Sequence, residues 1–376
     1  MESKEHLSAI ALTMLRPQLT PLQLMEIYRE AGSATAIVEA RHHLKDAFPA
    51  ISARVIDVMK DLDNAIIRAQ VEVEYAEKHN IKILTPDDIA YPQRLKDCPD
   101  APLVLYYYGN GELNAQRVVN IIGTRKCTTY GKDLIRHFVS DMSKMCPDTL
   151  IVSGLAYGVD INAHRESLAN GLPTLGVVAH GLDTIYPAVH RETAKEMISR
   201  GGLLTEYPHG TRPDKRNFVQ RNRIVAGMSD ACILVESAKK GGGLITVEIS
   251  NSYNRDVFAF PGSIGSPYSE GCNKAIREHQ AQLITSAEDF VQFMGWENAA
   301  ILQDARRQGI ERTLFPQLTD EEKAIVSALQ EHGDMQTNHL AVHTNLPIST
   351  ITATMFSLEM NGIVIPLAGG KYHLLD

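Results

Sequence analysis

Residues 149–181 have the sequence TLIVSGLAYGVDINAHRESLANGLPTLGVVAHG, and this stretch decides the fold. One short apolar run ends at Gly154, a segment with helical character follows from Asp160, and a second apolar run ends at Gly181. A strand, a helix and another strand in this order form one unit of a parallel sheet that is buried on both faces. The pattern therefore predicts an α/β domain.

The same alternation continues on both sides of this stretch. Helical segments separate the apolar runs, so we expect an extended Rossmann-like parallel sheet covered by helices on both faces. Ligands of such sheets bind at the carboxyl ends of the strands. The expected strands are 118–122, 149–154, 174–181, 202–206, 231–236 and 256–262.

The two ends of the chain predict smaller domains. Near the start, Thr20 is a plausible N-cap, Pro21 follows at the first helical position, and Gly32 ends the helix. Near the end, two helices, a turn at Leu346-Pro347, a third helix and two short strands around Gly369-Gly370 outline a winged helix-turn-helix. The expected domains are 1–80 (helical), 81–295 (Rossmann-like), 296–316 (linker) and 317–376 (winged helix).

Composition excludes several classes of protein. The chain has 376 residues, 44% of them hydrophobic, without an apolar run long enough to span a membrane or a convincing signal peptide. Its five cysteines are scattered and form no C-x-x-C pair, which argues for a reducing compartment and against zinc or a disulfide framework. We therefore expect a cytoplasmic protein with no membrane partner.

Charge is distributed unevenly along the chain. The total is −8, yet residues 117–295 carry 20 Lys and Arg against 18 Asp and Glu, a net charge of +2. Residues 317–376 carry 2 Lys and Arg against 7 Asp and Glu, a net charge of −5. A local basic cleft in the middle domain is compatible with an acidic total.

Residues 212–223, RPDKRNFVQRNR, place cations and one aromatic side chain just before an expected strand. Lys and Arg neutralise phosphates, and an aromatic ring gives a base a face for stacking. Alternatively, this is a solvated basic loop with Phe218 in the core. We favour a loop that grips single-stranded nucleic acid without recognising its sequence, because no basic helix is expected here for a duplex groove.

Glycine-rich turns at other strand ends predict anion sites. The turn at Gly123 leads past Arg125 into a helix whose N-terminal N–H groups suit a phosphate, although Arg125 could equally pair with a carboxylate. Residues 241–243 are three glycines before a helix, and we favour a phosphate-binding concavity there over a flexible turn. The candidate DNA-binding residues are Gly123, Arg125, Ser153, Gly154, Lys215, Phe218, Arg221, Asn222, Arg223, Gly242, Gly243 and Thr246.

Other polar residues at strand ends have structural interpretations. Asp160 and His164 are four residues apart and could form an acid–base or metal pair, but we expect them to pack beneath the loop. Asp183 is expected to cap a turn. The sequence has no nucleophile elbow, metal-ligand cluster or Walker lysine, so we expect no catalytic residues, no metal and no cofactor.

Together these motifs resemble the DNA-processing protein A (DprA/Smf) family. The resemblance rests on GTR, SGLAYGVDINAH, GLDTIYP, FVQRNRIVAG, GGGLITV and FPG, in this order. It implies a Rossmann-like domain that binds single-stranded DNA, forms a homodimer and helps to load a RecA-type recombinase in natural transformation. A helical domain of the SAM or helix-hairpin-helix kind and a winged helix are common attachments. The family's DNA pocket corresponds here to Arg125, Lys215, Phe218 and residues 221–223.

Two segments depart from the family pattern. Residues 241–243 are all glycine where many members have Ser-Gly-Ser, so hydroxyl donors are lost. Ala275-Ile276 and the following residues also differ, which weakens the prediction that a dimer contact lies near Leu283-Ile284. The alternative function is a nucleotide phosphoribohydrolase-like enzyme of the lysine-decarboxylase-like group, but Ile245 and the early Glu248 break its motif.

Overall fold

The computed structural model describes residues 2–15, 19–49, 51–296, 318–360, 363–367 and 371–374. The chain forms two compact units, residues 1–297 and 298–376. The expected linker lies outside the described residues apart from Trp296, as does the Gly369-Gly370 turn. The boundaries expected between the domains therefore stay predictions.

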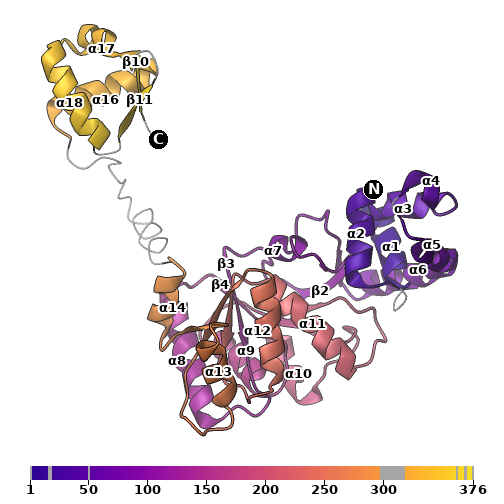
Figure 1. The fold of residues 1–376 in the computed structure, drawn as a ribbon. Helices are drawn as coiled ribbons and strands as arrows, with labels where there is room; N and C mark the ends of the chain where they lie inside the picture. Colours follow the sequence, from indigo (N-terminus) through magenta and orange to yellow (C-terminus); the bar gives the residue numbers. More distant parts are fainter. Residues whose placement is uncertain are drawn as a thin grey trace. The chain divides into compact units, whose positions relative to one another are not determined.

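Short amphipathic helices build the N-terminal part of the first unit (Figure 1). The N-cap predicted at Thr20 is confirmed, and the structure adds a capping box: the Thr20 hydroxyl accepts from the Gln23 backbone N–H, and the Gln23 side chain accepts from the Thr20 N–H. Gly32 ends the helix with φ of 78°, a conformation that favours glycine. The helices are α1 (Glu2–Thr13), α2 (Pro21–Ala31), α3 (Ala34–Glu39), α4 (Leu44–Ala47), α5 (Ala53–Val58), η1 (Met59–Asp61) and α6 (Leu62–Lys78).

One large sheet forms the centre of the first unit. In the described residues its strand order is β1-β2-β6-β5-β4-β3-β7-β8-β9. The strands from β6 to β9 in this order are parallel, whereas β1 and β2 are antiparallel additions at one edge. The strands are β1 (Lys82–Leu84), β2 (Leu105–Gly109), β3 (Arg117–Ile122), β4 (Thr149–Ser153), β5 (Thr174–Val177), β6 (Gly202–Thr205), β7 (Ala231–Leu234), β8 (Asp256–Ala259) and β9 (Gln282–Leu283).

Helices cover both faces of this sheet, as the sequence predicts (Figure 1). Successive residues of β3 point to opposite faces: Val118 packs in one core cluster, and Val119 packs in another. The covering helices are α7 (Gln93–Lys96), α8 (Thr129–Met145), α9 (Val159–Ala169), η2 (Ala188–His190), α10 (Arg191–Met197), α11 (Lys215–Gly227), α12 (Gly242–Ser252), α13 (Glu270–Arg277) and α14 (Ala287–Phe293).

The order of the strands creates a crevice at the carboxyl edge of the sheet. The chain runs outward from β3 through β4 and β5 to β6, then returns to place β7 on the other side of β3. The loops after β3 and β7 therefore diverge in opposite directions. Such a switch point is the usual ligand position in an open α/β sheet.

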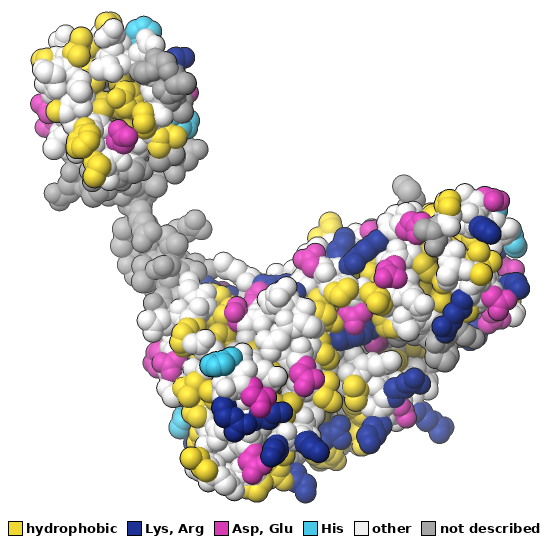
Figure 2. Space-filling view, in the orientation of Figure 1, with side chains coloured by type: hydrophobic (Ala, Val, Ile, Leu, Met, Phe, Trp, Pro, Cys, Tyr) yellow, Lys and Arg dark blue, Asp and Glu magenta, His cyan; other side chains and the backbone are white. Residues whose placement is uncertain are grey.

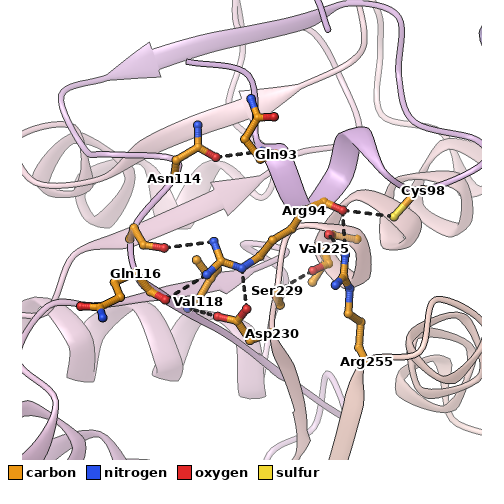
Figure 3. Close-up of polar contacts among 12 residues, drawn as sticks. Gln93, Arg94, Cys98, Asn114, Gln116, Val118, Val225, Ser229, Asp230 and Arg255 are labelled. Carbon is orange, nitrogen blue, oxygen red and sulfur yellow. Dashed lines mark hydrogen bonds and ion pairs between the residues drawn. The ribbon is translucent and has the colours of Figure 1, made fainter. Parts of the chain in front are cut away.

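At the amino edge of the sheet, the Arg94 side chain is fully engaged in structural contacts (Figure 3). Its Nε lies 2.5 Å from the Asp230 carboxylate, and its two terminal nitrogens donate to the carbonyls of Ala115 and Gln116 at 3.0 Å. Asp230 in turn accepts from the Val118 backbone N–H at 2.8 Å. This arginine ties the lead-in segment to the start of β3 and β7.

The second unit is the winged helix that the sequence predicts. Its elements are α16 (Asp320–His332), β10 (Met335–Gln336), α17 (Thr337–Thr344), α18 (Ile348–Met360), β11 (Val364–Leu367) and β12 (Lys371–Leu374). The three strands form one sheet in the order β10-β12-β11. A separate apolar cluster that includes Ile325, Leu340 and Ile351 gives this unit its own core.

Candidate functional site

A cavity of about 670 Å³ opens at the switch point of the sheet, and we call it the central cavity. Loops after β3 and β4 and the starts of α11 and α12 line it. Of the candidate DNA-binding residues, those that line it are Gly123, Arg125, Gly154, Lys215, Phe218, Arg221, Asn222, Gly242, Gly243 and Thr246. The structure thus brings together ten residues that are spread over more than 120 positions of the sequence.

The rim of the central cavity carries two accessible cations and two aromatic rings. Arg125 and Lys215 are exposed, and neither forms an ion pair with any residue that the structure describes. The Arg125 guanidinium lies 5.3 Å from the centre of the Phe218 ring, which is a cation–π geometry. The Tyr186 ring packs next to the Phe218 ring, with 5.7 Å between centroids and 45° between planes.

Arg221 forms part of the floor. Its side chain is buried, and one terminal nitrogen donates to the carbonyl oxygens of Gly154, at 2.7 Å, and Val177. A Cβ at Gly154 would lie 2.4 Å from that nitrogen, so a larger residue here would displace the Arg221 guanidinium. Asp160 lies beside this pair, and burial raises the pKa of its carboxyl group while Arg221 opposes the shift.

The start of α12 gives the central cavity a backbone anion site. Gly241 is the N-cap residue and makes no side-chain cap, so the first-turn N–H groups of Gly242 and Gly243 face the cavity with their partial positive charge. A Cβ at Gly242 would meet nothing within 4 Å, which shows that the space in front of this backbone is open. This arrangement suits the phosphate-binding concavity predicted from the sequence.

The start of α8 is different from our expectation of free N–H groups. The buried Glu236 carboxylate accepts from the Thr128 backbone N–H at 2.8 Å and from its hydroxyl at 2.6 Å. Because a protein carboxylate already occupies this helix terminus, Arg125 rather than the helix supplies the positive charge after β3. The same carboxylate helps to raise the pKa of Cys127 to about 12, after the larger effect of burial.

Two candidate residues lie outside the lining of the central cavity. Ser153 is buried and donates its hydroxyl to the Ile121 carbonyl at 2.6 Å. Arg223 is buried on another face of α11, where it pairs with the Glu206 carboxylate at 2.5 Å and donates to the Asp100 carbonyl at 2.8 Å. Both side chains serve the fold, so we remove them from the proposed site.

The basic segment is a helix, which corrects our expectation of a loop. Asp214 accepts from the Arg216 backbone N–H at 2.8 Å and caps α11. Lys215, Phe218 and Asn222 are spaced at i, i+3 and i+7, so they share the face of α11 that lines the central cavity. Arg223 follows Asn222 directly and therefore points elsewhere.

Asp160 and His164 do not form a pair with a common partner. Asp160 accepts from the Ala156 backbone N–H at 3.3 Å and lines the central cavity. His164 is fully buried, and its Nδ1 lies 2.7 Å from the Thr174 hydroxyl. Burial lowers the pKa of His164 to about 3, so the ring is neutral at physiological pH and has a packing role.

Tyr186 is the residue of the central cavity that the sequence analysis missed as a binding residue. Nothing in the sequence shows that its loop approaches Phe218. A tyrosine before a proline, in the loop after an expected strand, was the available signal. In the structure this tyrosine is exposed. Thr124 also lines the central cavity and was not selected.

Figure 2 shows where charged side chains gather in the view of Figure 1. Dark blue Lys and Arg side chains are frequent on the lower part of the first unit, whereas apolar side chains are prominent on the visible face of the winged helix. Among the described residues, no group of three or more His, Cys, Asp or Glu is arranged to hold a metal ion. No helix formed by these residues is long and apolar enough to cross a membrane.

Comparisons with known proteins identify the family of the chain. Residues 82–295 match the family model described as DNA recombination-mediator protein A, and residues 313–370 match the DprA winged helix domain. The chain is similar to Protein Smf of Synechocystis, with 34% identity over 80% of this chain and 82% of the relative. It is also similar to a putative DNA processing protein DprA of Mycobacterium tuberculosis, with 32% identity over 82% of this chain and 81% of the relative.

Two solved structures share the fold. An X-ray structure of DprA from Streptococcus pneumoniae has a TM-score of 0.57 and 29% identity, and the match covers 73% of this chain and 98% of that one. A structure of DprA from Helicobacter pylori, described in terms of its single-stranded DNA binding mode, has a TM-score of 0.52 and 30% identity. The match covers 57% of this chain and 95% of that one. This chain belongs to the DNA recombination-mediator protein A family, the DprA/Smf proteins.

Proposed function

We propose that the central cavity binds single-stranded DNA. The observation that carries the proposal is the rim, where Arg125 and Lys215, which form no ion pair with a described residue, flank the Phe218 ring. Cations that alternate with aromatic faces hold the backbone and the bases of a flexible strand without recognising a particular sequence. The Helicobacter pylori relative, whose title names single-stranded DNA binding, supports this assignment.

The experiment is fluorescence anisotropy with a labelled oligothymidine and a duplex of equal length, between 50 and 200 mM salt. We expect tighter binding of the single strand and a linear fall of log affinity with log salt, with a slope of about −0.7 for each phosphate contacted. Equal affinity for the duplex, or an affinity that does not change with salt, would contradict the proposal.

We further propose that the protein binds rather than transforms its ligand. The enzyme alternative requires a glutamate after the glycine cluster, but Glu248 is exposed and is absent from the lining of the central cavity. Asp160 is the acidic residue of the lining, and it lies beside Arg221 at the floor. Release of a free base from nucleoside monophosphates by the purified protein would contradict this view.

We also propose that the protein acts in the cytoplasm as a homodimer that delivers single strands to a RecA-type recombinase during transformation. Within the expected dimer contact, Ile284 is fully buried in the core, so only Leu283, which is 44% exposed on the edge strand β9, remains available. Two cavities in a dimer would raise affinity for one strand through effective concentration.

This proposal has two tests. Light scattering should give the mass of a dimer at micromolar concentration. Recombinase filaments should form faster on a strand coated with single-strand-binding protein when this protein is added. A strict monomer, together with no acceleration, would leave strand binding intact and refute delivery.

A further inference from the structure

The helical part of the first unit contacts a segment that leads directly to the central cavity. Residues 207–214 connect β6 to the start of α11, and we call them the strap. Glu72 of α6 is 3% exposed and accepts from the backbone N–H of His209 in the strap at 2.9 Å. The other oxygen of the same carboxylate contacts Nδ1 of the His209 ring.

Aromatic stacking reinforces this contact. The Tyr75 ring, one turn further along α6, stacks on the His209 ring at 4.2 Å between centroids and 10° between planes. On its other face it stacks on His79 at 4.0 Å. The His209 ring is therefore fixed by a hydrogen bond at one nitrogen and by a face-to-face contact, both from α6.

The strap carries this restraint to both aromatic residues at the rim. Its Gly210 donates a backbone N–H to the Asp183 carboxylate at 2.8 Å, and its Thr211 carbonyl accepts from the Gly181 N–H at 3.0 Å. These bonds hold the loop that presents Tyr186. The strap then ends at Asp214, the N-cap of α11, and α11 presents Lys215 and Phe218.

The loop that presents Tyr186 also packs on the helical part directly. Leu182 is partly buried against the apolar cluster that the N-terminal helices build. Burial raises the pKa of Tyr75, and the carboxylates of Asp183 and Glu72 add to the shift. The strap and Leu182 thus both connect the helical part to the residues that present the aromatic rings of the rim.

We propose that Glu72 is a positioning residue for strand binding: through His209 it holds the strap so that Phe218 and Tyr186 stay next to one another at the rim of the central cavity. Glu72 is not among the residues that line the central cavity. Its effect passes through a backbone hydrogen bond and a stacked ring. The inference rests on the proposed function, because it assumes that the rim receives bases.

The experiment uses the full chain and an oligothymidine containing one 2-aminopurine, whose fluorescence is quenched when the base stacks. Glu72→Ala removes both contacts with His209. We expect about fivefold weaker strand binding, at the lower end of typical coupling between sites, and less quenching even when the protein saturates the strand. Lower fold stability alone would not change quenching at saturation.

Glu72→Gln provides the conservative rescue. Its amide oxygen can accept from the His209 backbone N–H, and its NH₂ group can donate to a bare Nδ1 of the other imidazole tautomer. We therefore expect affinity and quenching close to those of the wild type. If Glu72→Ala does not fold, His209→Ala removes the side-chain contact from the strap instead.

His6→Ala is the matched control. His6 of α1 contacts the Asp88 carboxylate at 3.0 Å, so it is also an imidazole–carboxylate contact between the helical part and the rest of the unit. Asp88 lies in the lead-in segment after β1 and is not part of the strap. We expect His6→Ala to leave affinity and quenching unchanged.

The outcomes distinguish positioning by Glu72 from strand binding itself. Weaker quenching in Glu72→Ala or His209→Ala, with rescue by Glu72→Gln, would support positioning. Unchanged quenching and affinity in a folded Glu72→Ala protein would overturn it while leaving strand binding intact. A wild-type protein that does not bind the strand would overturn the proposed function and this inference together.

Discussion

The two edges of the central sheet both carry arginines, but these arginines have different partners. At the amino edge, all three guanidinium nitrogens of Arg94 have partners within 3.0 Å: one carboxylate and two carbonyl oxygens. At the carboxyl edge, the exposed Arg125 guanidinium lies over the face of an aromatic ring and forms no hydrogen bond or ion pair with a described residue. Saturated donors indicate a structural role, and unused donors beside a cavity indicate a site for an anion.

The largest expected effect tests the amino edge. Arg94→Ala leaves the Asp230 carboxylate without its counter-charge, so we expect the free energy of unfolding to fall by about 3 kcal/mol. Arg125→Ala should change it by less than about 0.5 kcal/mol, because an exposed side chain without fixed partners is lost. Urea denaturation of both variants measures the difference. A folded Arg94→Ala protein that has lost strand affinity would contradict the purely structural role of Arg94.

The second effect tests the carboxyl edge. In the double variant Arg125→Ala, Lys215→Ala we expect about a hundredfold weaker strand binding, because each charged contact contributes about 1.5 kcal/mol. The salt slope should fall by about 1.4, two phosphates at the single-strand value. Anisotropy over a salt series gives both quantities.

The matched control for this variant is Lys126→Ala, Arg216→Ala. These residues are the exposed sequence neighbours of Arg125 and Lys215, and they do not line the central cavity. The control removes the same net charge, so any loss it shares with the first variant reflects general electrostatic attraction. Equal losses of strand affinity in the two double variants would show that the central cavity is not the binding site.

The third effect tests the aromatic part of the rim. Phe218→Ala should weaken strand binding by about 1–3 kcal/mol if a base stacks on the ring. The salt slope should not change, since no phosphate contact is lost. Tyr157→Ala is the control, because Tyr157 is an exposed aromatic residue that does not line the central cavity. A lower salt slope in Phe218→Ala would mean that the ring acts by holding Arg125.

The carboxyl edge was largely predictable from the sequence, because apolar runs that end in glycine mark the ends of parallel strands. Gly123, Gly154 and the glycines at 242–243 follow different strands, and the carboxyl ends of parallel strands lie at one edge. Ten of the twelve candidate residues accordingly line one cavity. The sequence pattern was enough to predict these lining residues because the parallel topology brings the strand ends to the same edge of the sheet.

The predictions for Arg223 and for the start of α8 were wrong because they depend on helical geometry and on tertiary partners. Arg221, Asn222 and Arg223 were treated as one group, yet adjacent residues of a helix point about 100° apart. Arg223 consequently faces Glu206, which comes from the end of β6 and is distant in the sequence. Nothing in the local sequence identifies the carboxylate that Arg223 or the start of α8 will meet.

The smallest expected effect on strand affinity concerns the winged helix, which we compare with the carboxyl edge of the central sheet. The helix α18, the third helix of the winged helix-turn-helix, contains no Lys or Arg, and Ile348, Phe356 and Met360 on it are 53%, 65% and 73% exposed. An apolar helix without cations is a poor match for a phosphate backbone, so we expect this unit to bind protein or to add little to DNA affinity.

A chain that ends near residue 299 should therefore keep most of its strand affinity and its full salt slope. The first unit has its own core clusters on both faces of the sheet, so it should fold without the winged helix. We expect less than a tenfold change in affinity, since the cations and rings of the rim all belong to the first unit. Anisotropy with the same oligothymidine measures this directly. A loss of more than tenfold, together with a lower salt slope, would place phosphate contacts on the winged helix and limit the central cavity to part of the binding site.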